Sequence, residues 1–356
     1  MDEQVKQHNK ILVVLTGGTI GSKIGEDAIN VNEAAAYSLI SLYNERFGDD
    51  MEFEVIQPLN VLSENMTPEQ WNILVKALNE IDLKNYRGIV ITHGSDTLAY
   101  TSALVGMLYG RAGLPIGLIA ANYPLEDSRS NGINNFRAAV SFIKNENLPG
   151  VYTFYEDNKG IVQVYISTRL VEADCYEDQF QAFGGKAFGY MEKDHFIRNN
   201  ESYNPQQDQI KAYAGAIGTE SEAIGFSENV LLIRSYPGLN YSFYNWNTSK
   251  SKPKAVLIGL YHSATACVSS DKEGQYSLVE FARRCREAGI DVYAASFKST
   301  DMKFYSSINT FLEAGIVPMC NISTEAAYVK LMLAYSNNGG INIIDKNLYF
   351  EHLPIL

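Results

Sequence analysis

The chain has 356 residues, of which 46% are hydrophobic and 20% are charged, a composition typical of a soluble globular protein with room for two cores. Its formal net charge of -12 disfavours a nucleic acid or an anionic membrane surface as a partner, because both attract clustered Lys and Arg. We therefore expect no nucleic-acid and no membrane partner.

The amino terminus and the cysteines indicate the cellular compartment of the protein. The first ten residues are polar and the apolar run behind them is short, which predicts neither a signal peptide nor a membrane span. The four cysteines, Cys175, Cys267, Cys285 and Cys320, are scattered without CxxC spacing or a neighbouring His cluster. This pattern predicts reduced thiols, a cytoplasmic location and no metal site.

Apolar runs typical of buried strands alternate with helical patterns along the first part of the chain. Strands are predicted at 11–15, 52–56, 88–92 and 115–120, and helices at 32–46, 67–80, 97–110 and 129–143. Such alternation predicts a parallel sheet with helices on both faces. A turn-type run at 156–160 lies between two further strands and predicts a hairpin, which extends the sheet with antiparallel strands.

A second domain is predicted after a change in composition. Between 197 and 228 the chain is rich in Asn, Gln, Ser, Glu and Gly without sustained periodicity, which is typical of a linker. Strands are then predicted at 229–234, 255–261 and 290–295, and helices at 275–288, 307–313 and 323–336. The predicted fold class is therefore α/β, with a large, mostly parallel N-terminal domain (1–205), a linker (206–228) and a smaller C-terminal α/β domain (229–356).

Two of the predicted strands end in loops that carry reactive side chains. The first strand runs into Thr16-Gly17-Gly18-Thr19, and the strand at 88–92 runs into His93-Gly94-Ser95-Asp96-Thr97. Because the carboxyl ends of parallel strands meet at one edge of a sheet, we expect the two loops to face one crevice. The N–H groups next to Gly17 and Gly18 are candidate oxyanion donors, and His93 suits a packing position behind its loop better than a general base.

These two loops resemble those of the L-asparaginase/glutaminase family. Further similar segments occur in the same order at Leu62–Pro68, Pro124–Asn135, Arg234–Gly238 and Ile322–Leu331. The resemblance implies an amidohydrolase that releases ammonia from L-asparagine or a related carboxamide through a Thr19 nucleophile. It implies catalytic roles for Ser95 and Asp96.

The resemblance also implies how the ligand is bound and how the protein assembles. The substrate-binding residues it implies are Gly18, Ser63, Glu64 and Gly94. The ligand is a small amino-acid amide or peptide amide, and no metal or organic cofactor is needed. A homodimer or homotetramer is implied, in which the small domain of a neighbouring subunit completes each active site.

Two departures from the family pattern leave other functions open. Ile29 stands where the family has a loop tyrosine, and the acidic segment Glu172–Asp178, which contains Cys175, stands where it has a lysine. An acidic wall would favour a substrate that carries positive charge. The alternatives are a repurposed enzyme of this fold that acts on another amide or peptide, and a non-catalytic homologue that binds an amino acid.

Overall fold

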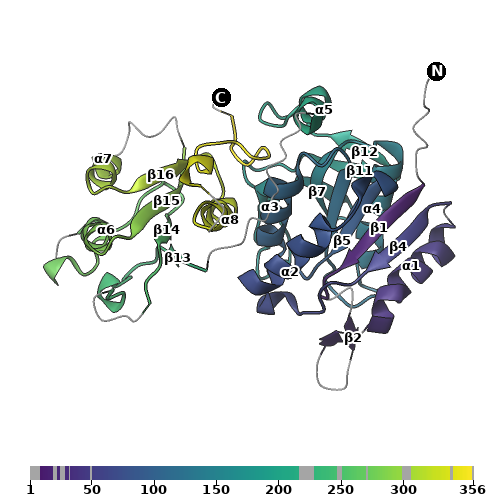
Figure 1. Ribbon diagram of the computed structural model, residues 1–356, viewed down its shortest axis with the longest axis horizontal. Helices are drawn as coiled ribbons and strands as arrows, with labels where there is room; N and C mark the ends of the chain where they lie inside the picture. The colour runs from purple at the N-terminus through teal and green to yellow at the C-terminus, as the bar shows by residue number, and fades with distance from the viewer. Residues whose placement is uncertain are drawn as a thin grey trace. The chain divides into compact units, whose positions relative to one another are not determined.

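A computed structural model describes residues 9–18, 22–24, 29–31, 33–48, 50–215, 228–246, 251–269, 272–298, 306–336 and 340–354. The chain divides into two compact units (Figure 1). The first unit contains residues 1–223 together with 348–350, and the second contains residues 224–347 together with 351–356.

The first unit is built on an eight-stranded sheet in the order β12-β11-β8-β7-β6-β5-β1-β4. Its strands are β1 (Lys10–Leu15), β4 (Glu52–Ile56), β5 (Gly88–Thr92), β6 (Pro115–Ile119), β7 (Gly150–Glu156), β8 (Val162–Ile166), β11 (Gly189–Glu192) and β12 (His195–Arg198). The pairs from β4 to β7 are parallel, whereas β8, β11 and β12 are added antiparallel. The parallel sheet and the hairpin predicted from the sequence are both confirmed.

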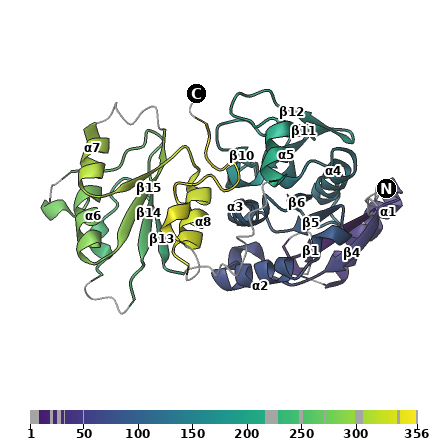
Figure 2. The same ribbon diagram turned by 45° about the horizontal axis from the view of Figure 1, so that its top comes forward.

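Helices cover the two faces of this sheet (Figure 2). They are α1 (Glu33–Phe47), α2 (Pro68–Asn79), α3 (Leu98–Tyr109), α4 (Gly132–Asn145) and the peripheral α5 (Gln207–Gly215). The α2 and α3 helices are joined by the Trp71 indole, which donates a hydrogen bond to the Thr101 hydroxyl at 2.9 Å. On the other face, the Tyr43 ring of α1 packs edge-on against the Phe136 ring of α4.

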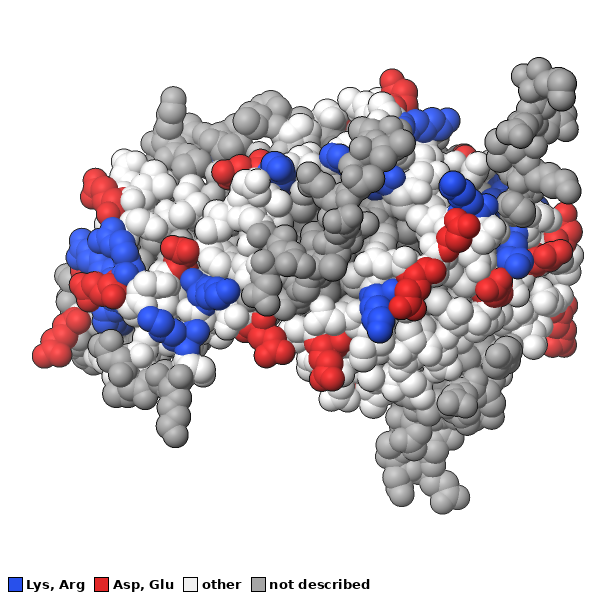
Figure 3. Space-filling model, viewed as in Figure 1, with Lys and Arg blue, Asp and Glu red and all other residues white. Residues whose placement is uncertain are grey.

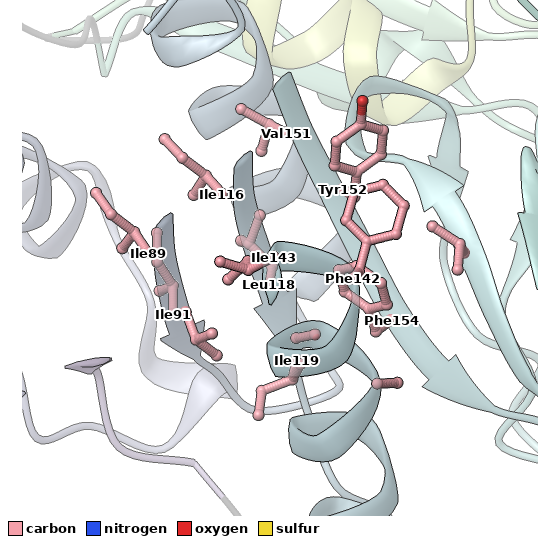
Figure 4. Close-up of a cluster of buried hydrophobic side chains, with 14 of the residues drawn as sticks. Ile89, Ile91, Ile116, Leu118, Ile119, Phe142, Ile143, Val151, Tyr152 and Phe154 are labelled. Carbon is pink, nitrogen blue, oxygen red and sulfur yellow. The ribbon is translucent and has the colours of Figure 1, made fainter. Parts of the chain in front are cut away.

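The core of the first unit lies between the central strands and these helices. Figure 4 shows Phe142 and Ile143 of α4 among side chains of β5, β6 and β7. All the residues of β5 and β6 are buried, which explains their nearly continuous apolar sequence, because a parallel strand covered on both faces has no solvent side.

The second unit is a four-stranded parallel sheet in the order β13-β14-β15-β16. Its strands are β13 (Val230–Arg234), β14 (Ala255–Gly259), β15 (Asp291–Phe297) and β16 (Val317–Cys320), and its helices are α6 (Leu278–Glu287), α7 (Ser306–Glu313) and α8 (Thr324–Ala334). The predicted smaller α/β domain is thus present, with β16 as a strand that the sequence pattern did not indicate.

Several short elements differ from the predictions. The hairpin of β2 (Ser22–Ile24) and β3 (Ile29–Val31), the pair of β9 (Leu170–Val171) and β10 (Gln181–Ala182), and the β11–β12 hairpin were not predicted. Helix α5 occupies part of the expected linker. Strands of two to four residues are too short to show a period of two, and therefore the sequence gives little sign of them.

The end of the chain returns to the first unit. Tyr349 is buried there, and its hydroxyl accepts a hydrogen bond from the Val151 N–H at 2.7 Å. The Thr168 hydroxyl donates to the Tyr349 carbonyl oxygen at 2.6 Å. The two units are therefore not two successive blocks of sequence, as the expected boundaries implied.

The surface charges, the helices and the cysteines bear on the expectations drawn from the composition. On the face in Figure 3, acidic and basic side chains are interspersed and do not form one basic patch. None of the helices in the described ranges is long and apolar enough to cross a membrane. The structure has all four cysteines as free thiols.

Candidate active site

The glycine turn after β1 is fixed by close contact with the loop that follows β4. The Gly18 N–H donates to the Val61 carbonyl oxygen at 2.9 Å, and the Val61 N–H donates to the Thr16 carbonyl oxygen at 3.0 Å. Gly17 has φ +103° and Gly18 has φ +74°, a region that favours glycine. Because the Gly18 N–H is already bonded, it is not the free oxyanion donor that the sequence suggested.

The second loop lies directly against the first. A Cβ atom on Gly18 would be 2.4 Å from the Gly94 nitrogen, so only glycine allows the two backbones to approach this closely. The Thr16 hydroxyl donates to the Thr92 carbonyl oxygen at 2.8 Å, which links the ends of β1 and β5. The loops that follow the two neighbouring strands thus meet at one sheet edge, which is where ligands of open α/β sheets bind.

Ser63 and Asp96 form the polar centre of this edge. Ser63 is 3% exposed at the start of a single 3-10 turn, Ser63–Asn65, and its hydroxyl donates to Asp96 Oδ2 at 2.8 Å. The Thr97 hydroxyl donates to the Ser63 carbonyl oxygen at 2.9 Å. Gly94 faces the same side chain, because a Cβ there would lie 2.4 Å from the Ser63 Oγ. Asp96 itself is exposed.

The remaining predicted residues lie at different depths around this centre. Ser95 is half-buried between Gly94 and Asp96, and its carbonyl oxygen accepts from the Leu98 N–H at 3.3 Å, where α3 begins. Glu64 is exposed on the turn next to Ser63. Thr19 lies outside the described residues.

His93 is buried behind its loop and is held there as a neutral ring. Its Nδ1 lies 2.8 Å from the Gly94 carbonyl oxygen, and because that oxygen can only accept, Nδ1 carries the proton. Its Nε2 is buried and has no hydrogen-bond partner among the described residues. Burial lowers the pKa of His93 to about 4, so the imidazole is uncharged at neutral pH. This environment favours the packing position over a general base.

The acidic segment Glu172–Asp178 forms a compact turn. Asp174 Oδ1 accepts from the backbone N–H of Tyr176 at 3.0 Å and of Glu177 at 3.3 Å. Glu172 instead accepts from the Tyr100 hydroxyl at 2.6 Å. The carboxylates of Asp174 and Glu172 are therefore hydrogen-bonded to nearby groups, whereas Cys175 is exposed in the turn.

Tyr100 is a residue that the sequence analysis missed. It lies four residues after Asp96, in the first turn of α3, and connects that helix to Glu172. Asp96 precedes the N-cap Thr97 and Glu172 is distant in the chain, so helical spacing gave no signal for this contact.

Known proteins are similar in sequence to almost the whole chain. The L-asparaginase of Thermococcus kodakarensis is 26% identical over 95% of this chain and 96% of its own length. A glutamyl-tRNA(Gln) amidotransferase subunit of Saccharolobus solfataricus is 26% identical over 99% of this chain and 78% of its own length.

Solved structures have the same fold. The structure of the thermostable L-asparaginase from T. kodakarensis superposes with a TM-score of 0.77 at 24% identity, covering 97% of this chain and 99% of that chain. The L-asparaginase I of Vibrio cholerae also gives a TM-score of 0.77, at 19% identity, over 98% of this chain and 100% of that chain.

The family model described as "Asparaginase, N-terminal" matches residues 10–203, which include the glycine turn, Ser63 and the loop from His93 to Thr97. This match spans more than half of the chain. The chain therefore belongs to the asparaginase family and is an amidohydrolase with the asparaginase fold.

Proposed function

We propose that the chain hydrolyses the carboxamide of L-asparagine or a related amino-acid amide through Thr19 and releases ammonia. The observation that carries this proposal is the Ser63–Asp96 hydrogen bond at the edge where the glycine turn meets the loop after β5. An exposed carboxylate held in one orientation is suited to bind the ammonium group of an amino acid. Thr19 follows Gly18 directly in the sequence, and Gly18 lies against the loop that carries Asp96.

The chemistry assigns a role to each neighbouring residue. An amide is a poor electrophile, so the reaction needs an activated nucleophile and hydrogen-bond donors for the developing oxyanion. In this proposal Thr19 attacks the amide carbon, Ser95 helps to position the hydroxyl or the water, and Gly18 and Gly94 let the substrate approach the backbone. Ser63 orients Asp96, and Glu64 lies beside the bound amino acid.

The test is ammonia release from L-asparagine by the wild-type protein and by Thr19→Ala. We expect the rate to fall to background in Thr19→Ala, with an unchanged circular dichroism spectrum. A matched control is Thr310→Ala, which removes a hydroxyl from the half-buried position on α7 in the second unit and should leave the rate unchanged. An undiminished rate of ammonia release by Thr19→Ala would contradict the role of Thr19 as the nucleophile.

The relatives favour L-glutamine as a further substrate, and the acidic segment favours amides that carry positive charge. Several relatives are named as subunits of a glutamyl-tRNA(Gln) amidotransferase, and Glu177 and Asp178 are exposed. We therefore include L-glutamine and a cationic amide, argininamide, in the ammonia assay. Turnover of asparagine alone excludes these further substrates, and ligand binding without any turnover would identify a non-catalytic homologue.

We also propose a homodimer or homotetramer in the cytoplasm. The relatives include a protein described as a probable cytoplasmic L-asparaginase from Campylobacter jejuni, which supports the location. Sedimentation equilibrium of the full chain, whose protomer is 39.6 kDa, measures how many protomers assemble, and a monomer at micromolar concentration would contradict the assembly.

A further inference from the structure

The second unit contains a pocket that is separate in its residues from the site of the first unit. It has a volume of about 490 Å³, within the range of small-molecule sites. Tyr244 and Trp246 supply aromatic surface, and Gln275 and Arg284 supply polar groups. Both aromatic side chains are half-buried, so each presents part of its ring to the pocket.

Arg284 is the positively charged side chain of this pocket. It is half-buried on α6, and its guanidinium forms no hydrogen bond and no ion pair with any described residue. Its Nη2 is buried and has no hydrogen-bond partner in the part of the chain that the structure describes. The preceding residue, Arg283, pairs with Glu280 and does not line the pocket. A half-buried guanidinium that forms no ion pair with a described residue favours a ligand that supplies a negatively charged acceptor.

The hydrogen bonds around the pocket leave a second donor. The Ser242 N–H donates to Asn240 Oδ1 at 2.8 Å, and a backbone N–H can only donate, which fixes the orientation of the Asn240 amide. Asn240 Nδ2 then donates to Gln275 Oε1 at 3.0 Å. The Gln275 oxygen is therefore occupied, and its NH₂ group remains a donor for the pocket.

We propose that this pocket binds a small monocarboxylate with a flat aromatic body. The carboxylate accepts hydrogen bonds from the pocket-facing side of Arg284 and from the Gln275 NH₂, and the flat body packs against Trp246 and Tyr244. Glu273 also lines the pocket and is exposed, so the lining carries one positive and one negative side chain. This balance favours a single negative charge over the two charges of a phosphate.

The test uses benzoate as the probe and the indole N–H signals of the full chain as the readout. The chain has two tryptophans, and Trp246 donates its indole N–H to the Cys285 sulfur at 3.3 Å beside the pocket, whereas Trp71 lies in the first unit. In ¹⁵N–¹H spectra we expect benzoate to shift the Trp246 signal saturably and to leave the Trp71 signal in place. Trp71→Phe assigns the two signals.

Variants and matched probes decide the outcome. Arg284→Gln should weaken benzoate binding by about tenfold or more, and Arg283→Gln, which removes the neighbouring charge, should not change it. Gln275→Leu should also weaken binding, which keeps the test valid if Arg284→Gln does not fold. The proposal is overturned by equal binding of uncharged benzyl alcohol, by tighter binding of inorganic phosphate, or by full benzoate affinity in a folded Arg284→Gln protein. No saturable shift of Trp246 overturns it as well.

Discussion

Replacing Gly94 with alanine tests whether the two loops and Ser63 form one packed arrangement. A Cβ atom on Gly94 would lie 2.4 Å from the Ser63 Oγ and 2.6 Å from the Ser63 Cβ. Ordinary contact needs roughly 3.5 Å, so the atoms must separate by about 1 Å. Ser63 has little freedom to move, because it is 3% exposed and its carbonyl oxygen accepts from the Thr97 hydroxyl at 2.9 Å.

Two costs follow from this displacement. Forcing a group into a filled space costs about 1–3 kcal/mol. Losing the Ser63–Asp96 hydrogen bond adds about 1 kcal/mol. This value is below the usual range for hydrogen bonds to charged groups, because Asp96 is exposed. The sum is about 2–4 kcal/mol of unfolding free energy, which lowers the midpoint of thermal unfolding by roughly 4–15 °C in a unit of this size.

The assay combines thermal unfolding with ammonia release. A shift of about 1 Å in a positioning residue can lower kcat/KM by about 100-fold, and therefore the rate should fall even at temperatures where the variant stays folded. The matched control is Gly259→Ala on β14, where the added Cβ would lie 3.3 Å from the flexible Arg234 side chain. The free energy of unfolding of this control should differ from that of the wild type by only about a few tenths of a kcal/mol, as for other well-tolerated substitutions.

A double variant separates the clash from other effects. Ser63→Gly removes the two atoms nearest to the added methyl group and leaves the Gly18 Cα at 3.3 Å, so Gly94→Ala should cost less stability in the Ser63→Gly background than in the wild type. Equal costs in the two backgrounds, or a Gly94→Ala protein with the stability and rate of the wild type, would refute the packed arrangement.

Three further predictions concern buried polar groups. The pKa of His93 falls from 6.5 in the unfolded chain to about 4 in the folded protein. Its contribution to stability is therefore present above pH 6.5 and is lost as the pH falls toward 4. In His93→Asn, the free energy of unfolding should change less with pH across that range. Lys330→Met should lower the unfolding free energy in urea by about 3–5 kcal/mol, because it leaves the buried Glu351 carboxylate without its partner at 2.8 Å, and adding Glu351→Leu should restore most of the loss. Tyr349→Phe should cost about 1 kcal/mol in the same measurement, because the Val151 N–H loses its acceptor, and an unchanged midpoint would contradict this role of the tail.

Local sequence patterns determined most of the elements. The start of α2 carries a local signal, since Thr67 and Gln70 form a capping box and Pro68 stands at the first helical position. Ser323 likewise caps α8 by accepting from the Ala326 N–H at 3.1 Å. These features depend on residues within one turn of each other, and therefore they can be read from the sequence alone.

The partners of the site were decided only by the tertiary structure. Ser63 and Asp96 were both candidates in the sequence, but their hydrogen bond joins residues 33 positions apart and depends on the parallel pairing of β1 with both β4 and β5. That pairing brings the loops after β1 and β5 together. The Gly18 N–H, which the sequence had suggested as an oxyanion donor, instead donates to the Val61 carbonyl oxygen in the loop after β4.

Two further features, the packing of residues 348–350 in the first unit and the place of Arg284 in the pocket, also could not be predicted from local sequence patterns. Residues 348–350 carry no periodicity that assigns them to the first unit, and Arg284 is one of several arginines on α6. Amino-acid sequence by itself determined most of the longer strands and helices and the identity of the reactive loops, because propensity, capping and period are local. Burial, hydrogen-bond partners and the charges left uncompensated were decided by the tertiary structure, because they depend on contacts between segments distant in the chain.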